Sequence, residues 1–198
     1  MNKKVIIGGL AVVVLLGIGG YSIVKKNKKK EANNIKIEQQ KEVESLNKNE
    51  LNNSIKGLSD QELIKKYLLL KDSKVPVKDR VEASEVARKF VKAITEYSSD
   101  DPNKGEKEAL SCVSEEIYKD IQGMFITKES DNTIENIVVD EEYSEETYNH
   151  EKNDYIFIKV RDGYYITDKY NQKREDVISY VVQLLKINGQ YKVISFKR

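Results

Sequence analysis

The chain has 198 residues, among them one cysteine, one histidine, two prolines and no tryptophan. A single cysteine excludes an internal disulfide. A single histidine, His150, lies in a polar stretch and leaves little for a metal site or a catalytic base, since both need several converging groups. No phosphate-binding glycine loop, zinc-protease pair or nucleophile elbow occurs in the sequence. The sequence therefore predicts no catalytic residues, no metal ligands and no cofactor, so that we expect a protein that is not an enzyme.

Acidic residues are missing from the first thirty positions, which hold seven of the 34 basic residues. From Glu31 onward, 27 basic residues stand against 33 acidic ones, so this part carries a net charge of −6. Nucleic-acid binding depends on clustered lysine and arginine against phosphate. We therefore expect no direct nucleic-acid binding by the soluble domain.

Residues 5–24 contain no charge, and twenty residues of helix span about 30 Å, enough to cross the hydrocarbon core of a bilayer. A lipoprotein would need a cysteine at the end of this run, but the only cysteine is Cys112. A cleaved signal peptide stays an alternative, because Gly19 and Gly20 are small enough to precede a cleavage site. The favoured interpretation is an uncleaved membrane anchor. Its apolar side chains are Val5, Ile6, Ile7, Leu10, Val12, Val13, Val14, Leu15, Leu16, Ile18, Ile23 and Val24.

Lysines flank both ends of the anchor, and they leave its orientation open. A count by the positive-inside rule keeps the following part in the cytoplasm, because five lysines follow the run and two precede it. A single N-terminal helix behind two lysines is, however, typical of a chain whose large C-terminal part is exported. The lysines after the run are also suited to anionic lipid headgroups. They are Lys25, Lys26, Lys28, Lys29 and Lys30.

The remaining chain divides into a polar stalk and a compact domain. We expect a tail at 1–4, the anchor at 5–24, a partly helical stalk at 25–74 and the domain at 75–198. Within the stalk, Ser59 and Glu62 have the spacing of a capping box, which predicts a short helix. Pro76 follows this helix and favours extended geometry in the residue before it.

Two helices and then several strands are expected in the domain. The first helix has an apolar face made of Ala83, Val86, Ala87, Phe90, Ile94 and Tyr97. Residues 98–105 are rich in turn formers, and a second helix is predicted for 106–122. Its apolar stripe includes Cys112 as a small core residue.

After the second helix the periodicity changes to two, which predicts strands at 137–143, 155–160, 164–167, 177–186 and 191–196. Asn188-Gly189 between the last two is a strong hairpin signal, because both turn positions need positive φ. Asp162-Gly163 is either a second tight turn or a bulge within one long strand. The fold class is therefore α+β, with helices packed on a curved antiparallel sheet.

Two groups of residues in the sheet region raise functional questions. An acidic run (Asp140, Glu141, Glu142, Glu145 and Glu146) lacks the spacing and the glycine of a calcium loop, and we expect it to be an exposed strand end or loop. Tyrosine supplies most of the aromatic side chains, with twelve Tyr against four Phe. These tyrosines either pack the sheet or form a protein-binding surface, where tyrosine is enriched. The candidates for such an interface are Tyr155, Tyr164, Tyr165, Tyr180 and Tyr191.

The segment VARKFVKAITEY and the closing hairpin YVVQLLKINGQYKVISF resemble the cone-shaped fold of the nuclear-transport-factor-two-like superfamily, over residues 83–196. With the anchor and stalk before it, the chain resembles the bitopic scaffold proteins of Gram-positive conjugative type IV secretion systems. The resemblance implies a non-enzymatic assembly component at the cell membrane, with its domain outside the cytoplasm. It also implies other secretion-channel proteins as partners, and self-association is compatible with it.

Two other functions fit the same fold. One is a small-ligand-binding or isomerase-like domain, since ketosteroid isomerases of this superfamily use an aspartate base and a tyrosine donor inside the cone. The other is a component of a different envelope assembly, such as a sporulation channel. A buried carboxylate with a raised pKa in a deep apolar pocket would favour the first, because fold alone does not define function.

Overall fold

The computed structural model describes residues 55–127, 133–150 and 155–198. The chain divides into two compact units, Met1–Asn52 and Asn53–Arg198, and every described residue belongs to the second. The expected membrane anchor and the lysines after it lie outside the described residues. Among the helices that are described, none combines the length and the apolar character that crossing a bilayer requires.

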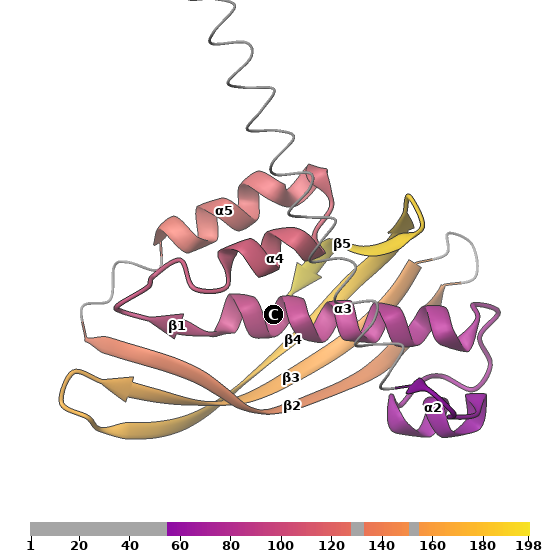
Figure 1. Ribbon diagram of the computed structural model, residues 1–198, viewed down its shortest axis with the longest axis horizontal. Helices are drawn as coiled ribbons and strands as arrows, with labels where there is room; N and C mark the ends of the chain where they lie inside the picture. Colours follow the sequence, from indigo (N-terminus) through magenta and orange to yellow (C-terminus); the bar gives the residue numbers. More distant parts are fainter. Residues whose placement is uncertain (1–54, 128–132, 151–154) are drawn as a thin grey trace, which may run out of the picture. The chain divides into compact units, whose positions relative to one another are not determined.

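The second unit is an α+β domain, as the sequence predicts. Its strands form one antiparallel sheet in the order β1-β2-β3-β4-β5. Figure 1 shows this sheet twisted and curved, with α3 lying along one face and α4 and α5 on the same side, further from the strands. The elements in chain order are α2 (Asp60–Lys66), α3 (Val77–Thr95), β1 (Tyr97–Ser98), α4 (Glu106–Cys112), the 3₁₀ helix η1 (Glu115–Ile117), α5 (Tyr118–Thr127), β2 (Ile134–His150), β3 (Tyr155–Asp168), β4 (Lys173–Ile187) and β5 (Gln190–Lys197).

The core lies between α3 and the covered face of the sheet, which we call the inner face. Phe90 of α3 is fully buried and meets the ring of Phe196 edge-on, with the ring centroids 5.0 Å apart. The sheet contributes Ile158 and Val160 from β3 and Val182 from β4, all of them 0% exposed. Alternate residues of β3 therefore point to the helices, and the residues between them define the outer face.

The predicted hairpin at the end of the chain is confirmed. Asn188 and Gly189 join β4 to β5 with φ of 53° and 83°, the positive values that this two-residue turn needs. The apolar face of the first helix is confirmed as well, because Ala83, Ala87 and Phe90 are all 0% exposed.

Asp162 and Gly163 lie within one long strand and do not form a tight turn. β3 continues through both residues, so the predicted strands at 155–160 and 164–167 are two parts of one element. The irregularity lies on the neighbouring strand instead, where the register of β2 shifts between Val139 and Glu141. Such a bulge bends and twists the strand that carries it.

The second helix is not continuous, which corrects the expectation of one helix at 106–122. Val113 adopts an extended conformation, forms a parallel bridge with Val193 of β5, and ends α4. The backbone N–H of Ser114 donates to the carbonyl of Val193 at 2.9 Å. The helical path resumes through η1 into α5, which runs past Gly123 to Thr127. A pairing partner 80 positions away in the sequence therefore overrides the local helical periodicity.

The folded domain begins earlier than residue 75, where the sequence places its start. The capping box forms as expected, with Ser59 and Glu62 bonding reciprocally at the start of α2. Leu63 and Tyr67 are buried at 1% and 3% exposure. Residues 59–74 therefore belong to the compact unit rather than to a solvated stalk.

Replacement of Phe90 by alanine tests the core. We expect Phe90→Ala to lower the free energy of unfolding by about 3–5 kcal/mol, because it leaves a cavity between α3 and β5. Urea unfolding of the full chain in detergent micelles measures this change. Lys78→Ala is the control on the same helix, since Lys78 is exposed, and it should change stability little. Equal stability of the two variants would contradict the core assignment.

Candidate functional site

A row of polar contacts connects α3 to β2, and we call it the polar seam. Its three pairs are Arg80 with Glu146, Ser84 with Ser144, and Arg88 with Glu142. The helix residues are four apart and therefore share one side of α3, while the strand residues are two apart and share the inner face of β2. The helix numbers rise as the strand numbers fall, so α3 and β2 run in opposite directions along the seam.

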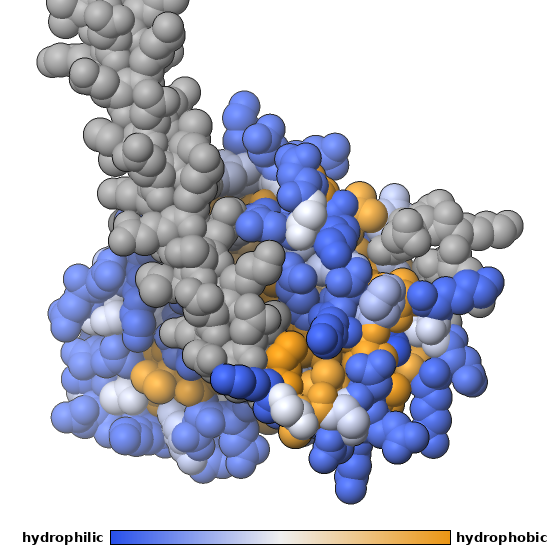
Figure 2. Space-filling view, turned by 45° about the vertical axis from the view of Figure 1, so that its right-hand side comes forward, coloured by the Kyte–Doolittle hydropathy of each residue, from blue (hydrophilic) through white to orange (hydrophobic). Residues whose placement is uncertain are grey.

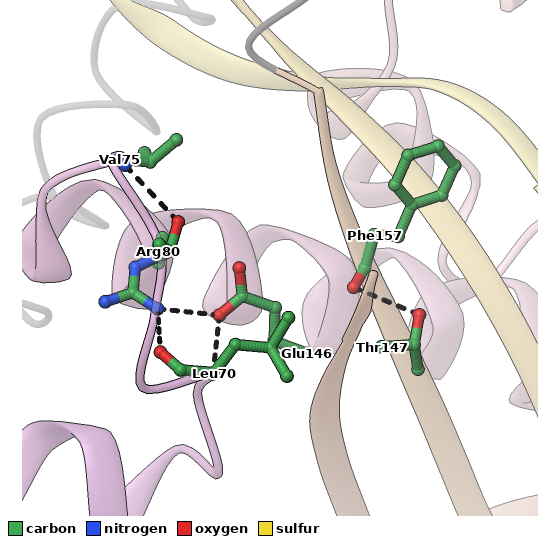
Figure 3. A network of polar contacts seen from close by, with 7 residues as sticks. Leu70, Val75, Arg80, Glu146, Thr147 and Phe157 are labelled. Carbon is green, nitrogen blue, oxygen red and sulfur yellow. Dashed lines mark hydrogen bonds and ion pairs between the residues drawn. The ribbon is translucent and has the colours of Figure 1, made fainter. Parts of the chain in front are cut away.

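The deepest pair of the seam is Arg80 with Glu146, and both side chains are 2% exposed. Figure 3 shows that this pair also fixes the backbone at Leu70. The Arg80 guanidinium donates to Glu146 Oε2 at 2.9 Å and to the Leu70 carbonyl at 2.6 Å, while the Leu70 N–H donates to the same Oε2 at 2.9 Å. The Glu146 N–H donates to the carbonyl of Leu68, whose φ is +50°. The segment after α2 is thus held by one buried ion pair.

The polar seam corrects the expectation that the acidic run is an exposed strand end. Asp140 and Glu141 are exposed, but Glu146 is buried and Glu142 pairs with an arginine of α3. The alternation of Glu142, Ser144 and Glu146 was a signal available in the sequence. It becomes informative only when α3 and β2 are known to be neighbours.

Loss of one partner from the deepest pair should cost far more than loss of a surface pair. We expect Arg80→Met to lower the free energy of unfolding by about 3–5 kcal/mol, because it strands the buried carboxylate of Glu146. The control is Lys186→Met, which breaks a partly exposed pair with Asp79 and should cost at most about 1 kcal/mol. Urea unfolding compares the two variants. Similar losses would mean that the buried pair is no more important than a surface pair.

The tyrosines proposed as an interface do not lie on one surface. Tyr191 is 4% exposed and belongs to the core, because its β5 position faces the helices, and this corrects its assignment to an interface. Tyr180 and Tyr164 lie at inner-face positions, and Tyr180 packs against the core. Tyr155 and Tyr165 are at outer-face positions. Only these last two are placed to meet a partner at the outer face.

The outer face carries a group of apolar and aromatic side chains, three of them exposed and one, Tyr165, half-buried. We call this group the outer patch: Val138, Tyr143, Tyr165 and Val177. Val138 lies directly opposite Tyr165 on the neighbouring strand, and Val177 lies opposite Gly163. Val138, Tyr143 and Val177 are 46–47% exposed. Gly163 has no side chain, and Glu141 of β2 lies opposite it with its side chain beside the glycine.

Charges surround the outer patch. The carboxylates of Glu175 and, to a smaller extent, Asp140 raise the pKa of Tyr165, so its hydroxyl stays protonated. The Tyr143 hydroxyl donates to Glu145 at 3.3 Å. Figure 2 shows hydrophobic residues gathered in patches between hydrophilic ones on the face that it draws. The exposed carboxylate of Glu141 lies within the patch, opposite Gly163. The outer patch is therefore a mixed surface of apolar, aromatic and acidic side chains, and such mixed surfaces occur in protein contacts.

The single cysteine and the single histidine add little chemistry. Cys112 is buried, as predicted, and burial raises the pKa of its thiol to about 11, so the reactive thiolate does not form at neutral pH. His150 ends β2, and its side chain lies outside what the structure describes. Within the described ranges, no three His, Cys, Asp or Glu side chains come together as metal ligands.

A fully buried carboxylate lies on the inner face, and no pattern in the sequence indicated its burial. Asp162 is 0% exposed, and its two carboxyl oxygens have no hydrogen-bond partner among the described residues. Burial is the main cause that raises its pKa to about 7, and the neighbouring carboxylate of Glu142 acts in the same direction. Asp162 therefore changes its charge near neutral pH.

No protein-family description matches the sequence, and no curated protein matches it. Among solved structures, one match is the crystal structure of CagV, a VirB8 homologue of the type IV secretion system from Helicobacter pylori strain 26695. The two chains are 12% identical, and the match covers 57% of this chain and 92% of the other, with a TM-score of 0.42. Similarity at this level leaves the function of this chain to be inferred from its own residues.

Proposed function

We propose that the protein is a non-enzymatic scaffold of a type IV secretion channel that transfers DNA in conjugation. In this proposal, residues 5–24 anchor it in the cell membrane by a single pass, and the domain lies outside the cytoplasm. It acts through contacts with other channel proteins and with copies of itself. The observation that carries the proposal is the outer patch, in which two valines and a tyrosine are 46–47% exposed on the face of the sheet that the helices do not cover.

The inner face supports a role in binding proteins rather than in chemistry. Large apolar side chains occupy it, among them Phe90, Phe125 and Ile158, each no more than 1% exposed. A reaction site of the isomerase kind needs open volume next to its base. The outer face offers the accessible surface instead.

The order of segments in the sequence gives further support. A charge-free run of twenty residues comes first, a polar stretch follows, and the compact unit begins at Asn53. A single anchor ahead of a folded domain holds that domain near the membrane, where channel components assemble. Conjugative transfer and a Gram-positive host come from the likeness of this layout to the scaffold proteins of such systems.

A charge placed in the outer patch should block assembly without unfolding the domain. We expect Val177→Arg to reduce conjugative DNA transfer by at least about tenfold, because a loss of 1.4 kcal/mol in binding is a factor of ten in affinity. The measurement is transfer frequency from donor cells, with protein level and thermal stability as checks. Ser195→Arg is the control, since Ser195 is exposed at an outer-face position of β5 outside the patch. Normal transfer with Val177→Arg would remove the outer patch as the binding surface.

The topology of the anchor can be tested independently. We expect protease added to intact protoplasts to digest the C-terminal domain, detected with an antibody to that domain. A cytoplasmic protein probed in the same samples controls for lysis. Protection of the domain until the protoplasts are lysed would place it in the cytoplasm and would rule out the proposed scaffold role.

A second candidate function is a small-ligand-binding or isomerase-like domain, and Asp162 is the observation that favours it. A buried carboxylate with a pKa near 7 is well matched to a general base. In the transfer assay, this candidate requires loss of function with Asp162→Asn and normal function with Val177→Arg. The scaffold requires that Val177→Arg be the variant that fails.

A further inference from the structure

Asp162 occupies a position where a charged carboxylate is poorly accommodated. It lies within β3 and is fully buried, with both Oδ atoms unpartnered among the described residues. The hydroxyl of Thr95 on α3 lowers the pKa of Asp162. This hydroxyl is itself buried, and it forms no hydrogen bond of ordinary geometry with a described residue. Burial without a hydrogen-bond donor costs a charged carboxylate much free energy. It costs the neutral acid far less, because the protonated carboxyl group has an O–H donor of its own.

One of the two cations of α3 that act on Asp162, Arg88, is already engaged by a second carboxylate. Glu142 lies directly opposite Asp162 on β2, and residues paired in this way point to one face with Cβ atoms about 4.5–5.5 Å apart. Arg88 pairs with Glu142 and also with Glu85 of its own helix. The carboxylate of Glu142 disfavours ionisation of Asp162, so Asp162 holds its proton more tightly than an ordinary aspartate does.

Charged and titratable groups reach Asp162 from each element packed against it. Burial raises its pKa most, Glu142 raises it further, and Thr95 and the two cations of α3 lower it. The facing groups are Arg88, Lys92 and Thr95 from α3, Glu142 from β2 and Tyr180 from β4.

We propose that Asp162 and Glu142 form a proton-sensitive pair beneath α3. A proton on Asp162 keeps the helix closed on the sheet. Loss of that proton loosens the last turns of the helix. The closed state holds Arg88 on Glu142. In the open state, water or Arg88 reaches the ionised Asp162. This inference is independent of the proposed assembly role, because it depends only on contacts inside the domain.

The direction of the pH effect follows from proton linkage. The folded domain binds the proton of Asp162 up to about pH 7, whereas an unfolded or open chain releases it near the ordinary pKa of 3.8. The closed state therefore binds more protons between these values, and its stability falls as pH rises from about 4 to about 7. Above that window the contribution of Asp162 is constant.

Hydrogen–deuterium exchange of the full chain in detergent micelles tests the proposal. Peptides covering residues 88–95 are followed from pH 5 to pH 8, with correction for the intrinsic pH dependence of exchange. We expect the opening constant of this segment to rise by up to about tenfold per pH unit until about pH 7 and then to level, as the release of one proton requires. Asp162→Asn should remove this pH dependence.

Two further variants make the test specific. Glu141→Gln removes one negative charge beside Glu142, but at an exposed position opposite Gly163, and it should behave as the wild type. Glu142→Gln leaves Arg88 available to Asp162. The pH-dependent rise of the opening constant should therefore shift to lower pH. The same pH dependence in the wild type and in Asp162→Asn would overturn the proposal.

A direct titration covers the case in which the Asp162 variant does not fold. Carbon-13 NMR of the Asp162 carboxyl in the wild-type protein should show a midpoint near 7. A midpoint near the ordinary value for aspartate, about 4, would overturn the proposal whatever the variants do.

Discussion

The buried ion pair between Arg80 and Glu146 is the contact on which the rest of the domain depends. It joins Arg80 on α3 to Glu146 on β2, 66 residues later, and to Leu70 in the segment between α2 and α3. Either charge alone would be buried without water or an opposite charge, which is strongly destabilising, so each fixes the position of the other. Once α3 is held along β2 in this way, its apolar side must face the centre of the sheet, and the core follows.

The same arrangement separates the two faces of the sheet by function. The inner face uses its polar residues for internal contacts with α3 and its apolar residues for packing. The outer face carries Val138, Tyr143 and Val177 as exposed side chains, with Glu141 beside Gly163 among them. Asp162 is the exception, because it is polar, lies on the inner face, and has no partner in the described part. A carboxylate retained in such a place makes the packing of the helix sensitive to protons, whichever proteins bind outside.

Local patterns predicted the local structure well and the long-range contacts poorly. The Asn188-Gly189 turn, the capping box at Ser59 and the apolar face around Phe90 each depend on neighbours within a few residues, and each is found in the structure. The break at Val113 depends on a strand 80 residues later, so no periodicity could reveal it. The inner-face positions of Glu142 and Glu146 could not be predicted either. An acidic run is expected to be solvated unless its arginine partners, here on α3, are known. Among the tyrosines, alternation along β3 could separate Tyr164 from Tyr165, whereas the burial of Tyr191 required the packing of β5.

The bridge between Val113 and Val193 also has a consequence for biogenesis. The strand that holds the end of α4 in place is the last of the described elements to be synthesised, and its Phe196 also completes the ring contact with Phe90. The helical half therefore stays unfinished while β2, β3 and β4 emerge, and the core closes only when β5 arrives. The described domain therefore completes its core only after its last described strand has been synthesised.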